Sequence, residues 1–234
     1  MSRIDTVEEL RRVAVHVIAR ARVAETGRFS LRVTPGGFGT PEFGDALRRV
    51  RVAGEHLVVE QDPPGGAAFH QAPLVGSSLA DLATVAGVDL GAPLDVGHDT
   101  PPLGDPDAPL VVDPGVLAET ADWYAVVEAA TTAIAAGVDA DAAPTLPRLW
   151  PEHFDVAIEV DAREGRRANL GGSPGDGFSA EPYLYVGPWT DERPGDDGYW
   201  DAPFGATRLR SALGADPVAD AVAFFEEGLA RLRD

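Results

Sequence analysis

Short connections between strand-like segments are the feature of this sequence that most limits its fold. Residues 49–52 and 57–61 have the apolar pattern of β-strands, and only four residues separate them. Residues 154–160 and 166–170 form a second such pair, separated by five residues, and residues 183–186 form a further strand-like run. Parallel neighbours need a crossover of about a dozen residues or more, so these pairs have to be antiparallel. The sequence therefore predicts antiparallel sheets and not a βαβ fold.

Amphipathic helices flank both groups of strands. Apolar residues recur at helical spacing from Thr6, which begins a capping-box pattern, to Gly27. His16 shares a face of this helix with two arginines and is predicted to be exposed. An Asp-Pro pair at residues 113–114, repeated at 216–217, is typical of a helix start, because proline is favoured at the first helical position. We therefore predict an α+β fold with antiparallel sheet flanked by helices.

The chain is long enough, at 234 residues, to bury a core without a disulfide or a structural metal. It contains no cysteine, which excludes disulfide scaffolds, thiolate zinc sites and a cysteine nucleophile. Small residues at 138–146 give the best candidate for a boundary. We expect residues 1–140 to hold a helix, an antiparallel meander, a long polar loop and a second helix. Residues 145–234 would hold the aromatic-rich strands and the C-terminal helix, as a second packed lobe or as part of one compact domain.

The net charge of −19 limits the partners of the chain. A strongly acidic protein does not suit nucleic acid or an anionic membrane, because both present phosphates that bind basic surfaces. No apolar segment has the length of a membrane span or of a signal peptide, so we expect a cytoplasmic protein. There is no lysine or arginine between Arg51 and Arg148. This acidic stretch is either solvated surface or a site that recruits a divalent cation or a basic partner. The sequence does not indicate an oligomeric state.

Several glycine-rich segments resemble known motifs but lack a required feature. Residues 171–175 match the G-x-S-x-G pattern of serine hydrolases, yet Pro174 follows the serine and has no N–H for an oxyanion hole. Residues 175–180 approximate a dinucleotide-binding turn but lead into a strand and not into a helix. A phosphate-binding P-loop needs a lysine, which this chain lacks. We therefore predict no nucleotide cofactor.

Two histidine-containing clusters are candidates for chemistry. Glu152, His153 and Asp155 stand together at the start of a strand and could act as general acid and base, or hold a divalent metal. His98 and Asp99 lie in the long polar loop and form a second candidate metal site. Turns capped by polar side chains explain both clusters equally well.

Aromatic residues concentrate between residues 150 and 204. Aromatic walls with a few carboxylates suit sugars, other small polar ligands or cations, although a core of large side chains would produce the same pattern. The candidate ligand-binding residues are Trp150, Asp176, Glu181, Tyr183, Tyr185, Trp189 and Trp200.

The C-terminal third contains the strings LWPEHFD at residues 149–155, SPGD at 173–176 and EPYLYVGPW at 181–189. In these strings the chain resembles a family of proteins of unknown function from high-GC actinobacteria. The resemblance implies a cytoplasmic bacterial protein and carries over no catalytic residue.

Three functions remain open. The leading hypothesis is a small-molecule-binding protein with an aromatic-lined pocket in its C-terminal half. The first alternative is a metal-assisted or acid–base hydrolase or isomerase that uses Glu152, His153 and Asp155. The second is an acidic interaction module without chemistry. A pocket that converges on His153 and Tyr183 would favour the first two, and an exposed apolar patch without a cleft would favour the third.

Overall fold

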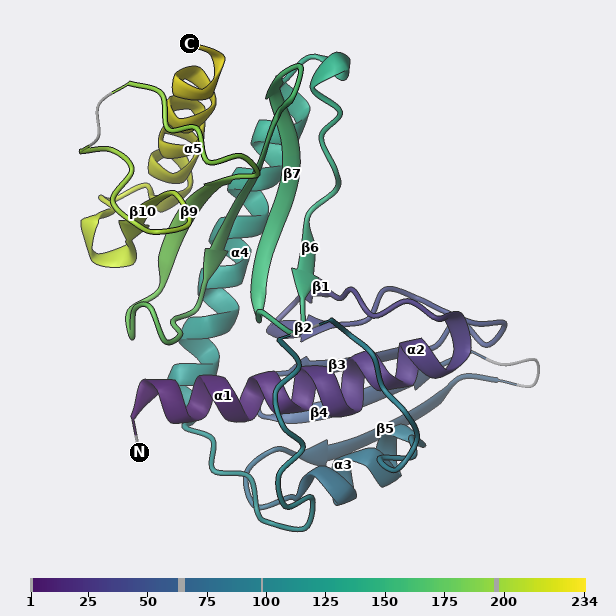
Figure 1. The fold of residues 1–234 in the computed structure, drawn as a ribbon. Helices are drawn as coiled ribbons and strands as arrows, with labels where there is room; N and C mark the ends of the chain where they lie inside the picture. Colours follow the sequence, from purple (N-terminus) through teal and green to yellow (C-terminus); the bar gives the residue numbers. More distant parts are fainter. Residues whose placement is uncertain (1, 63–65, 98, 196–197) are drawn as a thin grey trace. The chain divides into compact units, whose positions relative to one another are not determined.

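The structure, a computed structural model, describes residues 2–62, 66–97, 99–195 and 198–234 (Figure 1). It contains two five-stranded antiparallel sheets with flanking helices, so the predicted α+β fold is confirmed. The chain divides into two compact units. The first unit is Met1–Asp122 with Leu149–Phe154, and the second is Trp123–Arg148 with Asp155–Asp234. The predicted boundary at residues 138–146 lies inside the second unit.

The first unit begins with a long helix in three segments. These are α1 (Arg3–Val13), the π-helical η1 (Ala14–Ala19) and α2 (Arg20–Thr26). Ser2 and Asp5 form the capping box, so the predicted start at Thr6 is wrong. Thr6 is buried one turn further on, where its hydroxyl accepts a hydrogen bond from the backbone N–H of Asp113 (3.2 Å). The helix ends at Gly27 as predicted, because this residue takes the left-handed conformation of a C-cap.

The sheet of the first unit has the strand order β1-β2-β3-β4-β5. Its strands are β1 (Arg32–Thr34), β2 (Gly37–Gly39), β3 (Arg49–Ala53), β4 (His56–Gln61) and β5 (Ala68–Pro73). The predicted pair formed by β3 and β4 is confirmed. The short strand β2 and the mostly exposed edge strand β5 were not predicted, because neither has a clear alternation of apolar and polar residues. Helix α3 (Leu79–Ala86) follows, capped by Ser78.

Side chains of the long helix hold the polar segment that follows α3. Arg11 donates to the carbonyl of Asp99 (2.6 Å), and Arg12 donates to the carbonyl of Leu103 (2.6 Å). His16 lies 2.9 Å from the carbonyl oxygen of Pro101 through its Nε2 atom. Only 4% of His16 is exposed, so the prediction of an exposed histidine is wrong. The helix is polar on this face because it binds the backbone of a loop.

Helix α4 (Pro114–Gly137) begins in the first unit and continues into the second. The second sheet has the order β10-β9-β8-β7-β6. Its strands are β6 (Arg148–Trp150), β7 (Asp155–Arg163), β8 (Arg166–Ser173), β9 (Tyr183–Pro188) and β10 (Ala206–Leu209). The 3₁₀ turns η2 (Ala140–Ala142) and η3 (Arg210–Ala212) and the helix α5 (Pro217–Arg233) complete the second unit. The predicted strands that became β7, β8 and β9 are confirmed, and β10 was missed.

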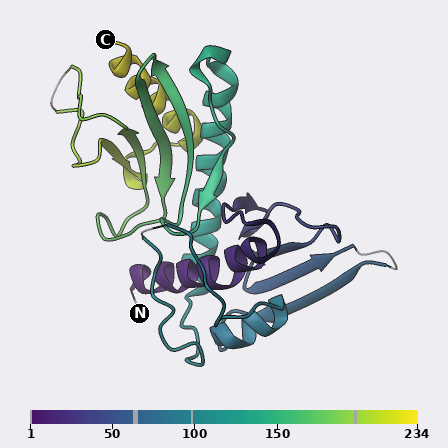
Figure 2. The same cartoon turned by 45° about the vertical axis from the view of Figure 1, so that its right-hand side comes forward.

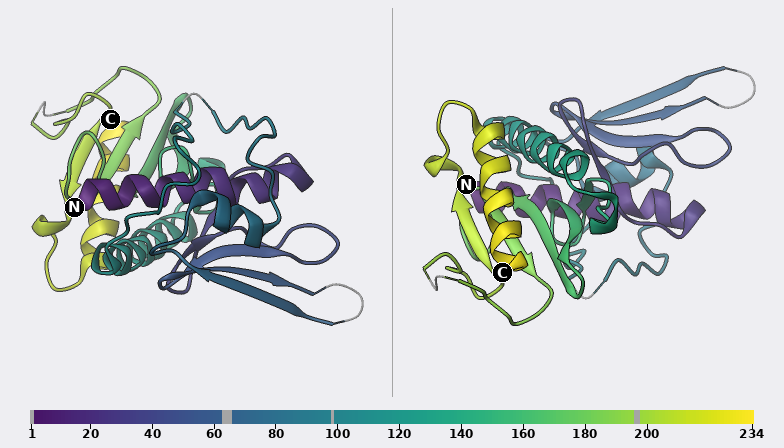
Figure 3. Two further views of the ribbon diagram at one scale, coloured as in Figure 1. Left: turned by 90° about the horizontal axis from the view of Figure 1, so that it is seen from below. Right: turned by 90° about the horizontal axis from the view of Figure 1, so that it is seen from above.

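Helices α4 and α5 lie along the same face of the second sheet (Figures 2 and 3). Glycines allow the two helices to approach the sheet closely. A Cβ atom added at Gly172 of β8 would lie 2.6 Å from Val127 of α4. A Cβ atom added at Gly228 of α5 would lie 2.7 Å from Val186 of β9. The side chains of this sheet face are buried and apolar, and they include Ile158, Val160, Leu170, Leu184 and Val186.

Alternation along the strands defines the opposite face of the sheet, which we call the tyrosine face. The cross-strand register places Tyr185 of β9 between Gly171 of β8 and Thr207 of β10. The central members of the face are Asp155, Glu159, Arg167, Asn169, Tyr183 and Tyr185. This face gathers several of the residues that the sequence marked as candidates.

Candidate functional site

Two tyrosine–carboxylate pairs form the polar centre of the tyrosine face. The Tyr185 hydroxyl donates to the carboxylate of Asp155, and only 8% of Asp155 is exposed. The Tyr183 hydroxyl donates to Asp176 (2.7 Å), which also accepts the hydroxyl of Ser173 (3.0 Å). The structure therefore brings together four residues that were predicted separately, Asp155 as catalytic and the others as ligand-binding.

Burial raises the pKa of the Tyr185 hydroxyl, and the Asp155 carboxylate raises it further. Burial also raises the pKa of Tyr183, with the hydrogen bond to Asp176 as the next cause. Both phenols are therefore protonated at neutral pH, and they act here as hydrogen-bond donors and not as bases.

Phe178 and Phe204 complete an aromatic cluster with the two tyrosines. The ring centroids of Phe178 and Phe204 lie 5.1 Å apart, and those of Phe178 and Tyr183 lie 5.3 Å apart. Rings at these distances are in contact, so no ligand fits between them. Phe178 is 47% exposed and Phe204 is 38% exposed. Both belong to the aromatic concentration seen in the sequence, but neither was among the predicted ligand-binding residues.

Trp189 continues the tyrosine face beyond the end of β9. Its indole N–H donates to Asn169 (2.9 Å), and the Arg167 guanidinium lies 5.5 Å from the centre of its ring. Trp189 is nevertheless 59% exposed. An exposed tryptophan in a fixed orientation is suited to bind a partner.

The other aromatic candidates occupy different positions. The Trp200 indole N–H donates to the carbonyl of Pro194 (2.9 Å), and its ring packs against Tyr199. Glu181 accepts the backbone N–H of Ser211 (2.5 Å). Trp150 belongs to the first unit, where its ring centroid lies 5.9 Å from that of Phe29. A ligand-binding role for these three residues stays a prediction.

The histidine clusters lie in the first unit, apart from Asp155. His153 Nδ1 lies 3.5 Å from a carboxylate oxygen of Asp99, and both side chains are about half exposed. Glu152 is buried, and its carbonyl accepts a hydrogen bond from Arg11 (2.7 Å). The same Arg11 side chain also donates to the backbone carbonyl of Asp99, so it links the two chain segments that carry the histidine–aspartate pair. His98 lies outside the described residues. Among the described residues, no three histidine, aspartate or glutamate side chains are placed to hold a metal ion.

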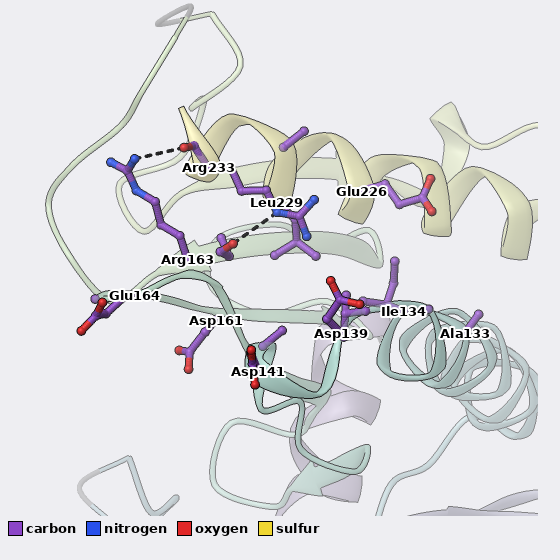
Figure 4. Close-up of a pocket in the computed structure, with 16 residues that line it drawn as sticks. Ala133, Ile134, Asp139, Asp141, Asp161, Arg163, Glu164, Glu226, Leu229 and Arg233 are labelled. Carbon is purple, nitrogen blue, oxygen red and sulfur yellow. Dashed lines mark hydrogen bonds between the residues drawn. The ribbon is translucent and has the colours of Figure 1, made fainter.

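A cavity of about 940 Å³ lies in the second unit. It is formed by the C-terminal ends of α4 and α5, by η2 and by the turn between β7 and β8 (Figure 4). Five carboxylate residues line it, namely Asp139, Asp141, Asp161, Glu164 and Glu226. Apolar lining comes from Ile134, Ala162 and Leu229. None of the aromatic candidates lines this cavity, so it differs from the aromatic-lined pocket that the sequence predicted.

Hydrogen bonds to backbone carbonyls engage the two arginines of the cavity. Arg233 donates to the carbonyl of Ala162 (3.2 Å), and Arg163 donates to the carbonyl of Arg233 (3.1 Å) (Figure 4). Asp161 is paired with Arg167 (3.0 Å). In the described part of the chain the other four carboxylates make no ion pair. The C-terminal end of α4 adds partial negative charge, whereas Arg163 and Arg166 donate to the last carbonyls of α5. With five carboxylates against two arginines, the lining is negative overall.

Comparison of the chain with protein-family models, with curated proteins and with solved structures gave no match. The resemblance to actinobacterial proteins therefore stays a prediction. Across the described ranges, no helix combines the length and the apolar character that crossing a membrane requires.

Proposed function

We propose that this protein binds a small organic cation in the cavity of its second unit. The observation that carries the proposal is the composition of the lining, in which five carboxylates stand against two arginines beside small apolar side chains. Ligand pockets for small molecules have volumes of roughly 300–1,000 Å³, and this cavity lies within that range. A cytoplasmic location and the absence of a nucleic-acid partner are part of the same proposal.

The chemistry of the lining selects an amine with an apolar segment. Asp139, Asp141, Glu164 and Glu226 are exposed at the edge of the cavity, where each can pair with an ammonium group. Ala133 and Ala230 are exposed and offer apolar surface to a hydrocarbon chain, and the buried side chains of Ile134 and Leu229 lie beneath them. An anion would meet five carboxylates against two arginines, so the lining as a whole would repel it. A diamine with a short alkyl chain is the simplest molecule with the required chemistry.

Isothermal titration calorimetry with 1,6-diaminohexane tests the proposal at low ionic strength. The matched neutral probe is 1,6-hexanediol, which has the same chain without the charges. We expect heat of binding with the diamine only. Exposed ion pairs contribute roughly 0.2–1 kcal/mol each. The double variant Asp139→Asn with Asp141→Asn should therefore weaken binding by about two- to thirtyfold.

A second double variant controls for the overall charge of the protein. Asp105→Asn with Asp107→Asn removes the same two charges from exposed positions in the first unit. It should leave the affinity for 1,6-diaminohexane nearly unchanged. Equal weakening by both double variants would mean that the diamine responds only to net charge. Equal binding of 1,6-hexanediol would mean that the carboxylates are not the recognition element. Either result would reject the proposal.

A further inference from the structure

Aromatic residues alternate along strand β9 and its extension; Trp189 is exposed (59%), whereas Tyr183 is buried (4% exposed). Every second position along this segment belongs to one line, namely Tyr183, Tyr185, Gly187 and Trp189. The register places the first three on the tyrosine face. The contacts of Trp189 with Arg167 and Asn169 place its ring on this face too. Six residues of extended strand span about 20 Å. The line therefore has the length of a short extended peptide.

A glycine separates the two aromatic parts of this line. A Cβ atom added at Gly187 would make only ordinary contacts, at 3.7 Å from the Phe204 carbonyl and 3.8 Å from the Tyr185 ring. The site of the missing side chain thus lies between the Tyr185 ring and the exposed indole of Trp189. Because the strand backbone there is extended, a larger side chain can be placed at residue 187 without backbone strain.

Carboxylates dominate the charge around the aromatic rings. Asp155, Glu159 and Asp161 come from β7, Asp176 follows β8, and Asp201 precedes β10. Among the described residues assigned to the face, Arg167 is the one cation, and it pairs with Glu159 and Asp161. Asp155 is buried against Tyr185, so Asp176 and Asp201 are the more accessible acids. Arg167 also illustrates the contact that a cation makes here, because its guanidinium stacks on Trp189 while it pairs with Glu159 (3.1 Å). Such stacking on an aromatic face is favourable for arginine in general.

We propose that the tyrosine face is a docking surface for a basic, extended peptide segment of another protein. Arginine or lysine side chains of the segment would stack on the exposed rings of Phe178, Phe204 and Trp189 and pair with the surrounding carboxylates. A second copy of this chain does not suit the surface, because a net charge of −19 opposes association with itself. The proposal rests on a different surface from the cation cavity and does not depend on it.

Fluorescence anisotropy with a labelled peptide of eight alternating arginine and leucine residues tests this surface on the 234-residue protein. We expect binding that is at least tenfold weaker for Trp189→Ala and for Gly187→Val. The second variant keeps every ring and every charge and only fills the space beside Tyr185, so it separates surface shape from charge. A peptide of alternating glutamate and leucine should not bind. Circular dichroism checks that both variants fold.

Three controls decide the interpretation. Leu146→Ala removes another exposed apolar side chain of the second unit, and Asp139→Asn with Asp141→Asn removes charge from the cavity. Both should leave the affinity for the arginine–leucine peptide within twofold of the wild type. If Trp189→Ala and Gly187→Val bind the peptide as well as the wild type does, the attraction is only that of net charge and the proposal fails. It also fails if the peptide does not bind while cellohexaose binds in a Trp189-dependent manner, because the surface would then recognise a saccharide.

Discussion

Replacement of each tyrosine of the network by phenylalanine tests how the tyrosine face is held together. Tyr185→Phe removes the hydroxyl that donates to Asp155, and only 8% of Asp155 is exposed. Hydrogen bonds to charged groups contribute about 1.5–3 kcal/mol. Tyr183→Phe removes a donor from Asp176, which keeps the Ser173 hydroxyl and the backbone N–H of Phe178 (2.8 Å). We therefore expect a smaller loss of about 0.5–1.5 kcal/mol for this variant.

Thermal unfolding of the two variants measures the difference. For a chain of this size, 1 kcal/mol corresponds to a shift in Tm of about 2–4 °C. Tyr185→Phe should lower Tm by about 3–12 °C, and Tyr183→Phe should lower it by roughly half as much. The two substitutions remove the same single oxygen atom, so each is the control for the other. An equal loss for both, or a larger loss for Tyr183→Phe, would refute the reasoning that the hydrogen bond to the more deeply buried carboxylate contributes more to stability.

Two further predictions concern a buried histidine and a close helix–sheet contact. Burial lowers the pKa of His16, with the nearby Arg20 and Arg12 lowering it further and the Pro101 and Pro102 carbonyls opposing the shift. The unfolded chain therefore takes up this proton first, and the wild type should lose stability relative to His16→Gln as the pH falls below about 6.5. Urea unfolding at pH 7.5 and at pH 5.5 measures this loss, and an unchanged difference between the two proteins would contradict it. Gly228→Ala should destabilise the second unit, because its Cβ atom would lie 2.7 Å from Val186 and overpacking costs about 1–3 kcal/mol, more than the gain of about 1 kcal/mol in helix propensity. Gly137→Ala, whose Cβ atom would meet nothing within 4 Å, is its control in the same thermal assay, and equal Tm values for the two variants would show that the sheet yields at Val186.

The strands that could be predicted are those whose apolar alternation and turn lie within one short stretch of sequence. Residues 49–52 and 57–61 carry their apolar alternation and their short turn in the sequence itself, and they became β3 and β4. Strand β10 has only four residues and depends on pairing with β9, so nothing local identifies it. The first helix shows the limit of local patterns. Both Ser2 and Thr6 begin a capping-box pattern, and the contact of Thr6 with Asp113, more than 100 residues away, places it inside the helix.

The candidate site was predictable in part for the same reason. Alternation along one strand placed Tyr183 and Tyr185 on a common face, and the register confirms it. Their pairing with Asp155 and Asp176 depends on how strands and a loop come together, which the sequence does not show. The cavity was missed entirely. Its lining comes from two helix ends, a 3₁₀ turn and a hairpin turn, and each of these segments alone is an ordinary acidic surface.

The most direct test of cation binding in the cavity is an NMR titration of the ¹⁵N-labelled protein with 1,6-diaminohexane. The account predicts that the amide shifts concentrate in residues 137–142, 162–165 and 226–233, the segments that line the cavity. It also predicts that 1,6-hexanediol leaves these amides unshifted. Shifts spread over acidic residues of both units, or centred on the tyrosine face, would contradict the account and show that the cavity is not a binding site.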